Sequence, residues 1–283
     1  MPLFFFLVFL LGIIFPNYAQ MLSKQESLKN IPNALILNKN IKPQSKTMAM
    51  VSCSGKSGST TLQSSFNAIG IETYRFHVLI DTMYDYILES EKDTAILLID
   101  SMRDIISRKV ASYFQHLTTS LEMSQSEVLA AYKKDRGDLF KKIQRQINSK
   151  ILKIAHFHAF RDWKKFNYDC LKDGNFDFKK KYQLKKIGNL YFVNLRFDDI
   201  ENWQEIIQSL DIPINFKNFK IVSANKSEDK WYRTIYKDFL TYFTISKSDF
   251  NTIISDFSEE ISHFYTEKEI EKFIEKWQSH FVD

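Results

Sequence analysis

Glycine, proline and cysteine are all scarce in this chain of 283 residues, with 7, 5 and 2 copies. Two cysteines, Cys53 and Cys170, are too few for a disulfide framework, so we expect an interior that is reduced or indifferent to oxidation. No internal repeat is visible. Charged residues make up 26% and aromatic residues 15% of the chain, which favours a globular protein over a disordered one.

The chain also lacks a glycine at position 50, which bears on the kind of phosphate loop that it can form. An apolar run, 48–51, leads into small polar residues around Lys56, and helix-compatible sequence follows from Leu62 to Ile69. This strand–loop–helix order is typical of a phosphate site, where main-chain N–H groups and a helix N-terminus face the anion. A Walker A loop would need glycine at position 50, which is Met50.

The loop instead reads Lys56-Ser57-Gly58-Ser59-Thr60-Thr61, with a glycine after the lysine as well as Gly55 before it. That order resembles the 5′-phosphosulfate loop of sulfotransferases, K-[ST]-G-[ST]-[ST]. The resemblance implies that the loop holds the 5′-phosphate of 3′-phosphoadenosine 5′-phosphosulfate. An ATP or GTP site, and a plain Ser/Gly-rich turn that begins an ordinary helix, are the alternatives.

The wider pattern predicts an α/β fold. Strands are expected at 48–52, 73–80, 95–99 and 190–195, separated by helical stretches that include 60–68, 81–91, 100–117 and 200–210. Strands that alternate with helices indicate βαβ units and an open parallel sheet, here P-loop-like and flanked by helices. The C-terminus should be helical, beginning at a Thr266…Glu269 capping box with an apolar stripe that packs on the core.

We expect one domain from 47 to 283, after a lead-in at 21–46, with a basic helical insert at 119–186. Between Lys133 and Lys186 the chain has 17 Lys and Arg against 6 Asp and no Glu, a net charge of +11. Such a region suits an anionic partner, although a solvated helix face is the simpler explanation.

The N-terminal segment, 1–20, is set apart from the fold. Its apolar run, 3–15, is shorter than the ~20 residues of a spanning helix. A signal-peptide core, a membrane anchor and a true start at Met21 remain open. Because a bacterial cell makes the nucleotide donor in its cytosol, we expect a cytoplasmic domain, with or without an anchor, or a Golgi-lumen enzyme in a eukaryote.

A second anion site is expected after the strand at 95–99. The segment from Arg103-Asp104 to Ser112 resembles the sulfotransferase R-D-P…S segment, in which Arg and Ser hold the 3′-phosphate. It departs from that pattern in Ile105, which replaces proline, and in one extra residue before Ser112; Ser107 and Arg108 are substitutes for Ser112. A surface ion pair between Arg103 and Asp104 is the alternative.

His77 lies in the expected second strand between Phe76 and Val78. An imidazole with an ordinary pKa near 6.5 can take a proton from an acceptor hydroxyl. Several polysaccharide sulfotransferases have a histidine in this region, so the resemblance implies a general base. A buried core histidine is the other explanation.

A third match lies at 223–239, where Asn225, Lys226, Lys230, Trp231 and Tyr232 stand in order. It looks like the Asn…Lys-Trp-Tyr segment of a sulfotransferase-like bacterial group described as putative capsular polysaccharide synthesis proteins. In the wider family the equivalent loop closes over the 3′-phosphate, which makes Asn225, Lys226 and Lys230 the candidate contacts. Trp231 is expected to anchor the loop to the core.

Taken together, the resemblance spans 48–239 and implies a sulfotransferase that uses 3′-phosphoadenosine 5′-phosphosulfate, without a metal, on an anionic or neutral saccharide rather than on nucleic acid. Lys56 and His77 would be catalytic. The cofactor would be bound by Gly55, Lys56, Ser57, Gly58, Ser59, Thr60, Thr61, Arg103, Ser112, Asn225, Lys226 and Lys230. An ATP-dependent kinase, with Asp100 as its magnesium ligand, and a non-catalytic glycan-binding or capsule-assembly protein are the alternatives.

Overall fold

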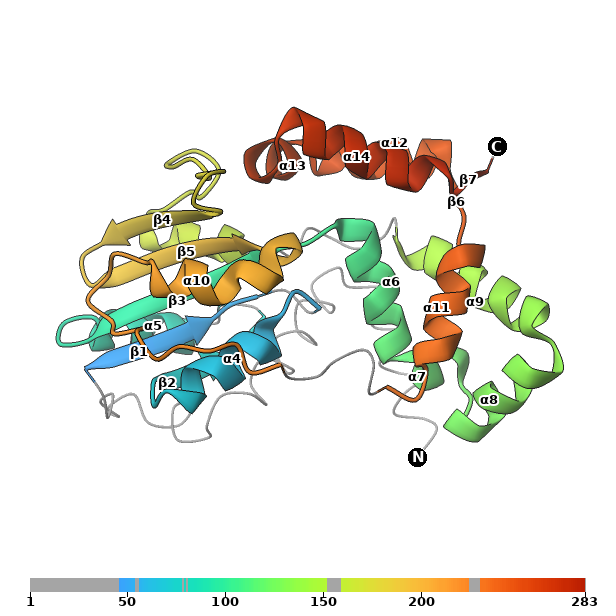
Figure 1. The fold of residues 1–283 in the computed structure, drawn as a ribbon, viewed down its shortest axis with the longest axis horizontal. Helices are drawn as coiled ribbons and strands as arrows, with labels where there is room; N and C mark the ends of the chain where they lie inside the picture. Colours follow the sequence, from blue (N-terminus) through green and yellow to red (C-terminus); the bar gives the residue numbers. More distant parts are fainter. Residues whose placement is uncertain are drawn as a thin grey trace.

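The computed structural model describes residues 46–53, 56–77, 79, 81–151, 159–223 and 230–282. Segment 1–20, nearly all of the lead-in at 21–46, and the candidate residues Gly55, Asn225 and Lys226 therefore lie outside the described residues. The rest forms a mostly parallel sheet with helices on both faces and a group of helices beside it (Figure 1).

Five strands form the main sheet in the order β2-β1-β3-β5-β4, all parallel except the edge strand β4. Their bounds are β1 Thr47–Val51, β2 Glu72–Arg75, β3 Ala95–Met102, β4 Tyr182–Ile187 and β5 Leu190–Arg196. The inner strands β1, β3 and β5 are apolar runs that are buried along nearly their whole length, as expected for parallel strands that are covered on both faces. The predicted α/β class with a mostly parallel sheet is confirmed.

Helices cover the two faces of this sheet differently. On one face, α4 (Ser59–Ala68) and α10 (Trp203–Gln208) pack against the alternate residues of β1 and β3 that include Val51 and Ile99. On the other face, α5 (Asp81–Ser90) and the 3₁₀ helix η1 (Ala159–Phe166) pack against residues such as Met50 and Leu98. Figure 1 shows α4 and α10 in front of the sheet and α5 behind it.

The remaining helices gather beyond the end of β3 (Figure 1). They are α6 Ile105–Gln115, α7 Leu117–Leu121, α8 Gln125–Lys134, α9 Arg136–Ile151, α11 Arg233–Tyr242, α12 Lys247–Asp256, α13 Ser258–Phe264 and α14 Glu267–Gln278. Two short strands, β6 Ile245–Ser246 and β7 Phe281–Val282, pair with each other, and a 3₁₀ helix, η2 Phe197–Asn202, leads into α10. Phenylalanines join this group, since Phe114 of α6 packs 5.4 Å from Phe239 of α11.

Two sequence-based expectations about the sheet are wrong. The insert at 119–186 is not helical throughout, because its last residues form β4, whose lysines had suggested a solvated helix; lysine is common on edge strands because it discourages further pairing. The second strand ends at Arg75, not Ile80, because its register partner Val51 is the last residue of β1. His77 therefore lies beyond the strand.

The start of α14 agrees with the sequence. The Thr266 hydroxyl accepts from the Glu269 N–H, and the Glu269 carboxylate accepts from the Thr266 N–H, which completes the predicted capping box. The apolar stripe is core-directed chiefly through Trp277, which is buried. Ile270 and Phe273, by contrast, are half-buried and line a cavity of about 270 Å³ under α13 and α14.

Candidate functional site at the carboxyl edge of the sheet

The candidate residues converge because parallel strands present their carboxyl ends at one edge of a sheet, where α/β proteins bind ligands. The loop with Lys56 follows β1, His77 follows β2, and Arg103 follows β3. These three segments lie side by side because β1 pairs with β2 on one side and with β3 on the other.

The loop after β1 leads directly into the N-terminus of α4. Gly58 is the N-cap of this helix with φ +88°, and Lys56 also has a positive φ of 69°. Within the described residues, no side chain caps this helix end and its first turn holds no acid. The hydroxyl of Ser101, on β3, donates to the Ser57 carbonyl and so fixes the loop against the sheet. The first-turn N–H groups of α4 are thus placed to receive an anion.

Glycine at position 58 is required on two counts. Its positive φ is unfavourable for other residues. A Cβ atom there would lie 2.5 Å and 2.7 Å from two ring carbons of Trp203, with Phe197 at 3.6 Å. These two rings, from the chain that leaves β5, form an aromatic wall against the loop. Neither ring was singled out from the sequence, because nothing local to Phe197 or Trp203 indicates contact with position 58.

Positive charges from three separate segments meet at this helix end. Arg103 donates to the Lys56 carbonyl at 2.6 Å, and its guanidinium lies 4.3 Å from the centre of the Phe197 ring. Burial lowers the pKa of the Lys56 ammonium, and the charges of Lys230 and Arg103 lower it further. Mutual repulsion of this kind makes an anion the favoured occupant of the cluster.

Arg75 is a fourth cation that sequence reasoning missed. At the end of β2, its guanidinium donates to the Thr60 hydroxyl, in the first turn of α4, at 2.7 Å. The β1–β2 register places Arg75 opposite Val51, immediately before the loop. A basic residue at the end of a strand next to the loop strand was the available signal, but it needed the strand order to be interpreted.

His77 lies against the same loop. Its Nδ1 is 2.6 Å from the Cys53 carbonyl oxygen, which can only accept, so Nδ1 carries the proton. In the neutral ring the lone pair is then on Nε2, the form that a general base requires. His77 reaches the loop from the turn after β2 and not from within the strand, where the sequence pattern had placed it.

Asp100, the candidate magnesium ligand of the kinase alternative, is wholly buried in β3. Its carboxyl oxygens accept from the main-chain N–H groups of Ser101 and, at 2.9 Å, of Phe160. Burial raises the pKa of Asp100 to about 7, partly offset by these hydrogen bonds and by the charge of Arg108. Asp100 thus serves the interior of the fold, where both of its carboxyl oxygens are occupied by main-chain donors.

Asp104 does not pair with Arg103. It caps α6 by accepting from the Ser107 N–H at 3.1 Å, and it accepts from Lys276 of α14 at 2.7 Å. The guanidinium of Arg103 therefore bonds to the Lys56 carbonyl and not to Asp104. Ser107 is committed to the same cap, since its hydroxyl donates to Asp104.

The two other 3′-phosphate candidates on α6 differ in position. Ser112 is half-buried two turns into the helix, and no hydrogen bond joins it to Arg103 or to Lys56 among the described residues. Arg108 is buried, and burial lowers its pKa to about 10, with Asp100 acting in the opposite direction and Arg103 lowering it further. The burial of Arg108 counts against a role as a phosphate ligand.

Lys230 reaches the cluster because the segment after it is anchored. Tyr232 is buried, with its ring 6.1 Å from Phe114, and Trp231 packs edge-on against Tyr232. Trp231 thus packs on the core, as the sequence analysis expected. Of the site candidates within the described residues, Lys56 to Thr61, His77, Arg103 and Lys230 come together, whereas Ser112 lies apart.

Comparisons with protein-family models, curated proteins and solved structures find no match to this chain. Among the described residues, His, Cys, Asp and Glu side chains form no group of three or more that could hold a metal ion. In the same part of the chain, no helix combines the length and apolarity needed to cross a bilayer. The case for a function therefore depends on the geometry of the cationic loop.

Proposed function

We propose that this protein is a P-loop-like sulfotransferase that moves a sulfuryl group from 3′-phosphoadenosine 5′-phosphosulfate to a hydroxyl of a saccharide, such as a capsular or other surface glycan. One observation carries the proposal: Lys56, Arg103 and Lys230, from three segments far apart in the chain, meet at the N-terminus of α4. Each of these segments resembles a sulfotransferase motif.

The roles follow from position. The first-turn N–H groups of α4 and the hydroxyls from Ser57 to Thr61 would hold the 5′-phosphate, with Arg75 fixing Thr60. Arg103 and Lys230 would hold the 3′-phosphate, with Asn225, Lys226 and the half-buried Ser112 as further candidates. A nucleotide with two phosphate groups accounts for more than one cation at this edge.

The transfer needs one base and one cation. The bond from the acceptor oxygen to sulfur forms while the bond from sulfur to the phosphate bridging oxygen breaks, which releases the 3′,5′-bisphosphate. His77 would take the hydroxyl proton on Nε2, because Nδ1 donates to Cys53. Lys56 would offset the charge that develops on the bridging oxygen, a contribution that is often the largest single one.

The kinase alternative has less support. Its only sequence candidate for a magnesium carboxylate, Asp100, is buried and already accepts two main-chain hydrogen bonds. Magnesium in nucleotide sites is bound by carboxylate and phosphate oxygens together with water, so a ligand needs access to solvent. Asp100 would have to leave both partners to provide one.

Calorimetric titration of the full chain tests the proposal. We expect 3′-phosphoadenosine 5′-phosphate to bind more tightly than ATP with magnesium. Arg103→Ala should weaken the bisphosphate by about 10–100-fold, since hydrogen bonds to charged groups contribute about 1.5–3 kcal/mol. Arg136→Ala is the matched control, because Arg136 is a solvent-exposed arginine that pairs with Asp238 on the helical side of the molecule.

The other outcomes are equally informative. Preference for ATP with magnesium would favour the kinase. Binding of neither nucleotide, together with retention on a glycan array, would favour a non-catalytic glycan-binding protein. Equal loss of bisphosphate binding in Arg103→Ala and Arg136→Ala would contradict the role given to Arg103.

A further inference from the structure

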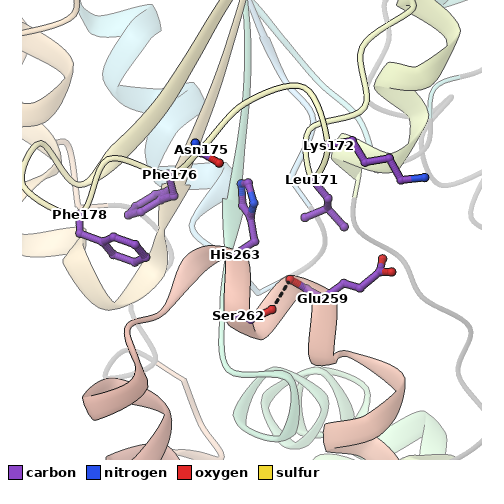
Figure 2. A pocket seen from close by; sticks show the side chains of 8 residues that line it. All are labelled: Leu171, Lys172, Asn175, Phe176, Phe178, Glu259, Ser262 and His263. Carbon is purple, nitrogen blue, oxygen red and sulfur yellow. Dashed lines mark hydrogen bonds between the residues drawn. The ribbon is translucent and has the colours of Figure 1, made fainter.

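A second cavity, of about 460 Å³, opens at the other end of the sheet edge. Figure 2 shows it between the loop that precedes β4 and the helix α13. It is lined by Leu171, Lys172, Asn175, Phe176, Phe178, Glu259, Ser262 and His263. Its volume falls within the roughly 300–1,000 Å³ of small-molecule sites.

The cavity lies at the same edge as Lys56. Since β4 runs antiparallel to β5, its first residue, Tyr182, pairs with Leu195 near the carboxyl end of β5. Three strand spacings separate β1 from β4 in the order β1-β3-β5-β4, which amounts to about 14 Å at ~4.8 Å per spacing. A chain molecule could therefore occupy the cavity and the cationic loop together, whereas a single small ring could not.

An aromatic ring stands at the rim of the cavity. Phe178 is 41% exposed, whereas its neighbour Phe176 is buried and holds it edge-on with ring centres 5.5 Å apart. Figure 2 shows both rings on one side of His263. Phe178 gains little by burial in the fold, so its face is available to a ligand with an apolar surface.

The polar lining suits a neutral ligand with many hydroxyl groups. Asn175 offers an amide that can donate and accept, Glu259 accepts and Lys172 donates. No hydrogen bond to a described residue is seen for the side chains of Asn175 and Glu259. One ammonium and one carboxylate offset each other, in contrast to the clustered cations around Lys56.

His263 adds a fixed acceptor. The Gln183 amide is oriented by its donation to the Cys170 carbonyl at 2.9 Å, so its oxygen faces the His263 Nε2 at 3.1 Å. That nitrogen must therefore donate, and the neutral ring keeps its lone pair on Nδ1. Burial lowers the pKa of His263, which favours this neutral form at physiological pH.

We infer that this cavity binds a neutral sugar unit of an oligosaccharide, with the apolar face of the sugar on Phe178 and its hydroxyls on Asn175, Glu259 and His263. The inference rests on the proposed function, which it deepens: the bound unit is distant from the unit that is sulfated. Acceptors that are long enough to span both ends of the edge are then preferred over monosaccharides.

The test pairs two binding measurements on the full chain. A glycan array printed with neutral and acidic oligosaccharides reports on the cavity, and calorimetry with 3′-phosphoadenosine 5′-phosphate reports on the Lys56 loop. We expect Phe178→Ala and Asn175→Ala to lose at least tenfold of the array signal without change in bisphosphate affinity. Tyr242→Ala, at an aromatic residue 36% exposed on α11, is the matched control and should keep both.

The outcomes separate the two proposals. Glycan binding that is equal in Phe178→Ala and the wild type, or no glycan binding by a wild type that binds the bisphosphate, overturns the cavity inference alone. If the wild type binds glycans, loses that binding in Phe178→Ala and does not bind the bisphosphate, the cavity inference is supported and the sulfotransferase proposal is overturned. A loss of bisphosphate affinity in Phe178→Ala would place the nucleotide, not a sugar, in the cavity. Circular dichroism melting confirms that each variant is folded.

Discussion

The two ends of the carboxyl edge of the sheet differ in how their positively charged side chains are paired. At the β1–β3 end, the charges of Arg103 and Lys230 act on Lys56 beside the N-terminus of α4, which no side chain of a described residue caps. At the β5–β4 end, Arg196 pairs with Asp199 at 2.6 Å and with Glu269 at 2.8 Å. The pKa of Lys56 is lowered at the first end by burial and by the charges of Lys230 and Arg103, whereas the buried Arg196 at the second end is paired with carboxylates. Among the described residues, the two ends thus differ in whether carboxylates pair with the cations.

Buried polar groups connect the two ends beneath the edge. Asp100 of β3 is the register partner of Asn194 of β5, which in turn is the partner of Gln183 of β4. All three are at most 2% exposed and point to the same face of the sheet. Asn194 donates to the Gln183 oxygen at 3.1 Å, and Gln183 contacts His263. The polar row therefore ends at the Gln183 amide, which contacts His263 of the cavity.

The largest expected effect comes from the cationic end. Lys56→Ala should lower the rate of sulfuryl transfer by roughly 10²–10³-fold, the usual cost of losing one preorganised charge-stabilising group. Its thermal stability should not fall, because the Lys56 ammonium is repelled by Arg103 and Lys230. Transfer from a radiolabelled donor to a saccharide, with a melting curve, measures both.

Lys141→Ala is the control for this change, since Lys141 is an exposed lysine of α9 within the basic insert. Its rate should equal the wild-type rate. A wild-type rate in Lys56→Ala would remove the catalytic role from the loop, and a rate reduced equally in both variants would make the effect one of overall charge.

The next largest effect concerns the aromatic wall. Gly58→Ala should destabilise the protein by about 2–4 kcal/mol, because the methyl group meets both a strained φ and the ring of Trp203. That corresponds to a melting temperature lower by very roughly 5–15 °C. Bisphosphate affinity should fall with it, since the α4 N-terminus moves.

Gly70→Ala separates the two causes. Gly70 has a similar φ of +77°, but a Cβ there would meet nothing within 4 Å. Gly70→Ala should lower the free energy of unfolding by about 1–2 kcal/mol through backbone strain alone. If both variants melt at the same temperature, the contact with Trp203 contributes nothing and the wall does not constrain the loop.

The smallest expected effect is a pH dependence of the free energy of unfolding that arises from Asp100 in the polar row. The pKa of Asp100 is raised to about 7 in the folded protein from an ordinary 3.8, because the group is buried. The folded state then holds a proton that the unfolded state releases, so this contribution to stability is full below pH 4 and is lost as the pH rises to 7. Asp100→Asn should remove that dependence, on the order of 1–3 kcal/mol.

Urea unfolding at pH 5 and pH 8 measures the difference. Asp100→Asn should cost stability at both pH values, because the new amide group faces a main-chain donor in place of a carboxyl oxygen. The gap between the two pH values should nevertheless be smaller than in the wild type. Asp256→Asn, at an exposed carboxylate of α12, should keep the wild-type gap. An unchanged gap in Asp100→Asn would mean that Asp100 is ionised in the folded protein.

Sequence patterns predicted the elements whose signals are local. The apolar runs of β1, β3 and β5 and the start of α4 lie within a few residues of their expected bounds, because a buried strand or a helix start is encoded by neighbouring residues. β4 was missed because an edge strand rich in lysine has the composition of a solvated helix. At the candidate site, the loop residues and Arg103 were named from the sequence, whereas Arg75, which bonds to Thr60, was not.

By itself, then, the sequence determined an α/β chain with a Ser/Gly-rich loop between its first strand and helix, a basic middle region and a capped last helix, since each of these is set by short-range pattern. Only the tertiary structure decided which strands are neighbours, and with that the partners of Lys56, the tautomer of His77, the burial of Asp100 and the cavity beside β4. The reason is physical: contacts such as those of Arg75 with Thr60 and Trp203 with Gly58 depend on strand order and register, which no stretch of neighbouring residues contains.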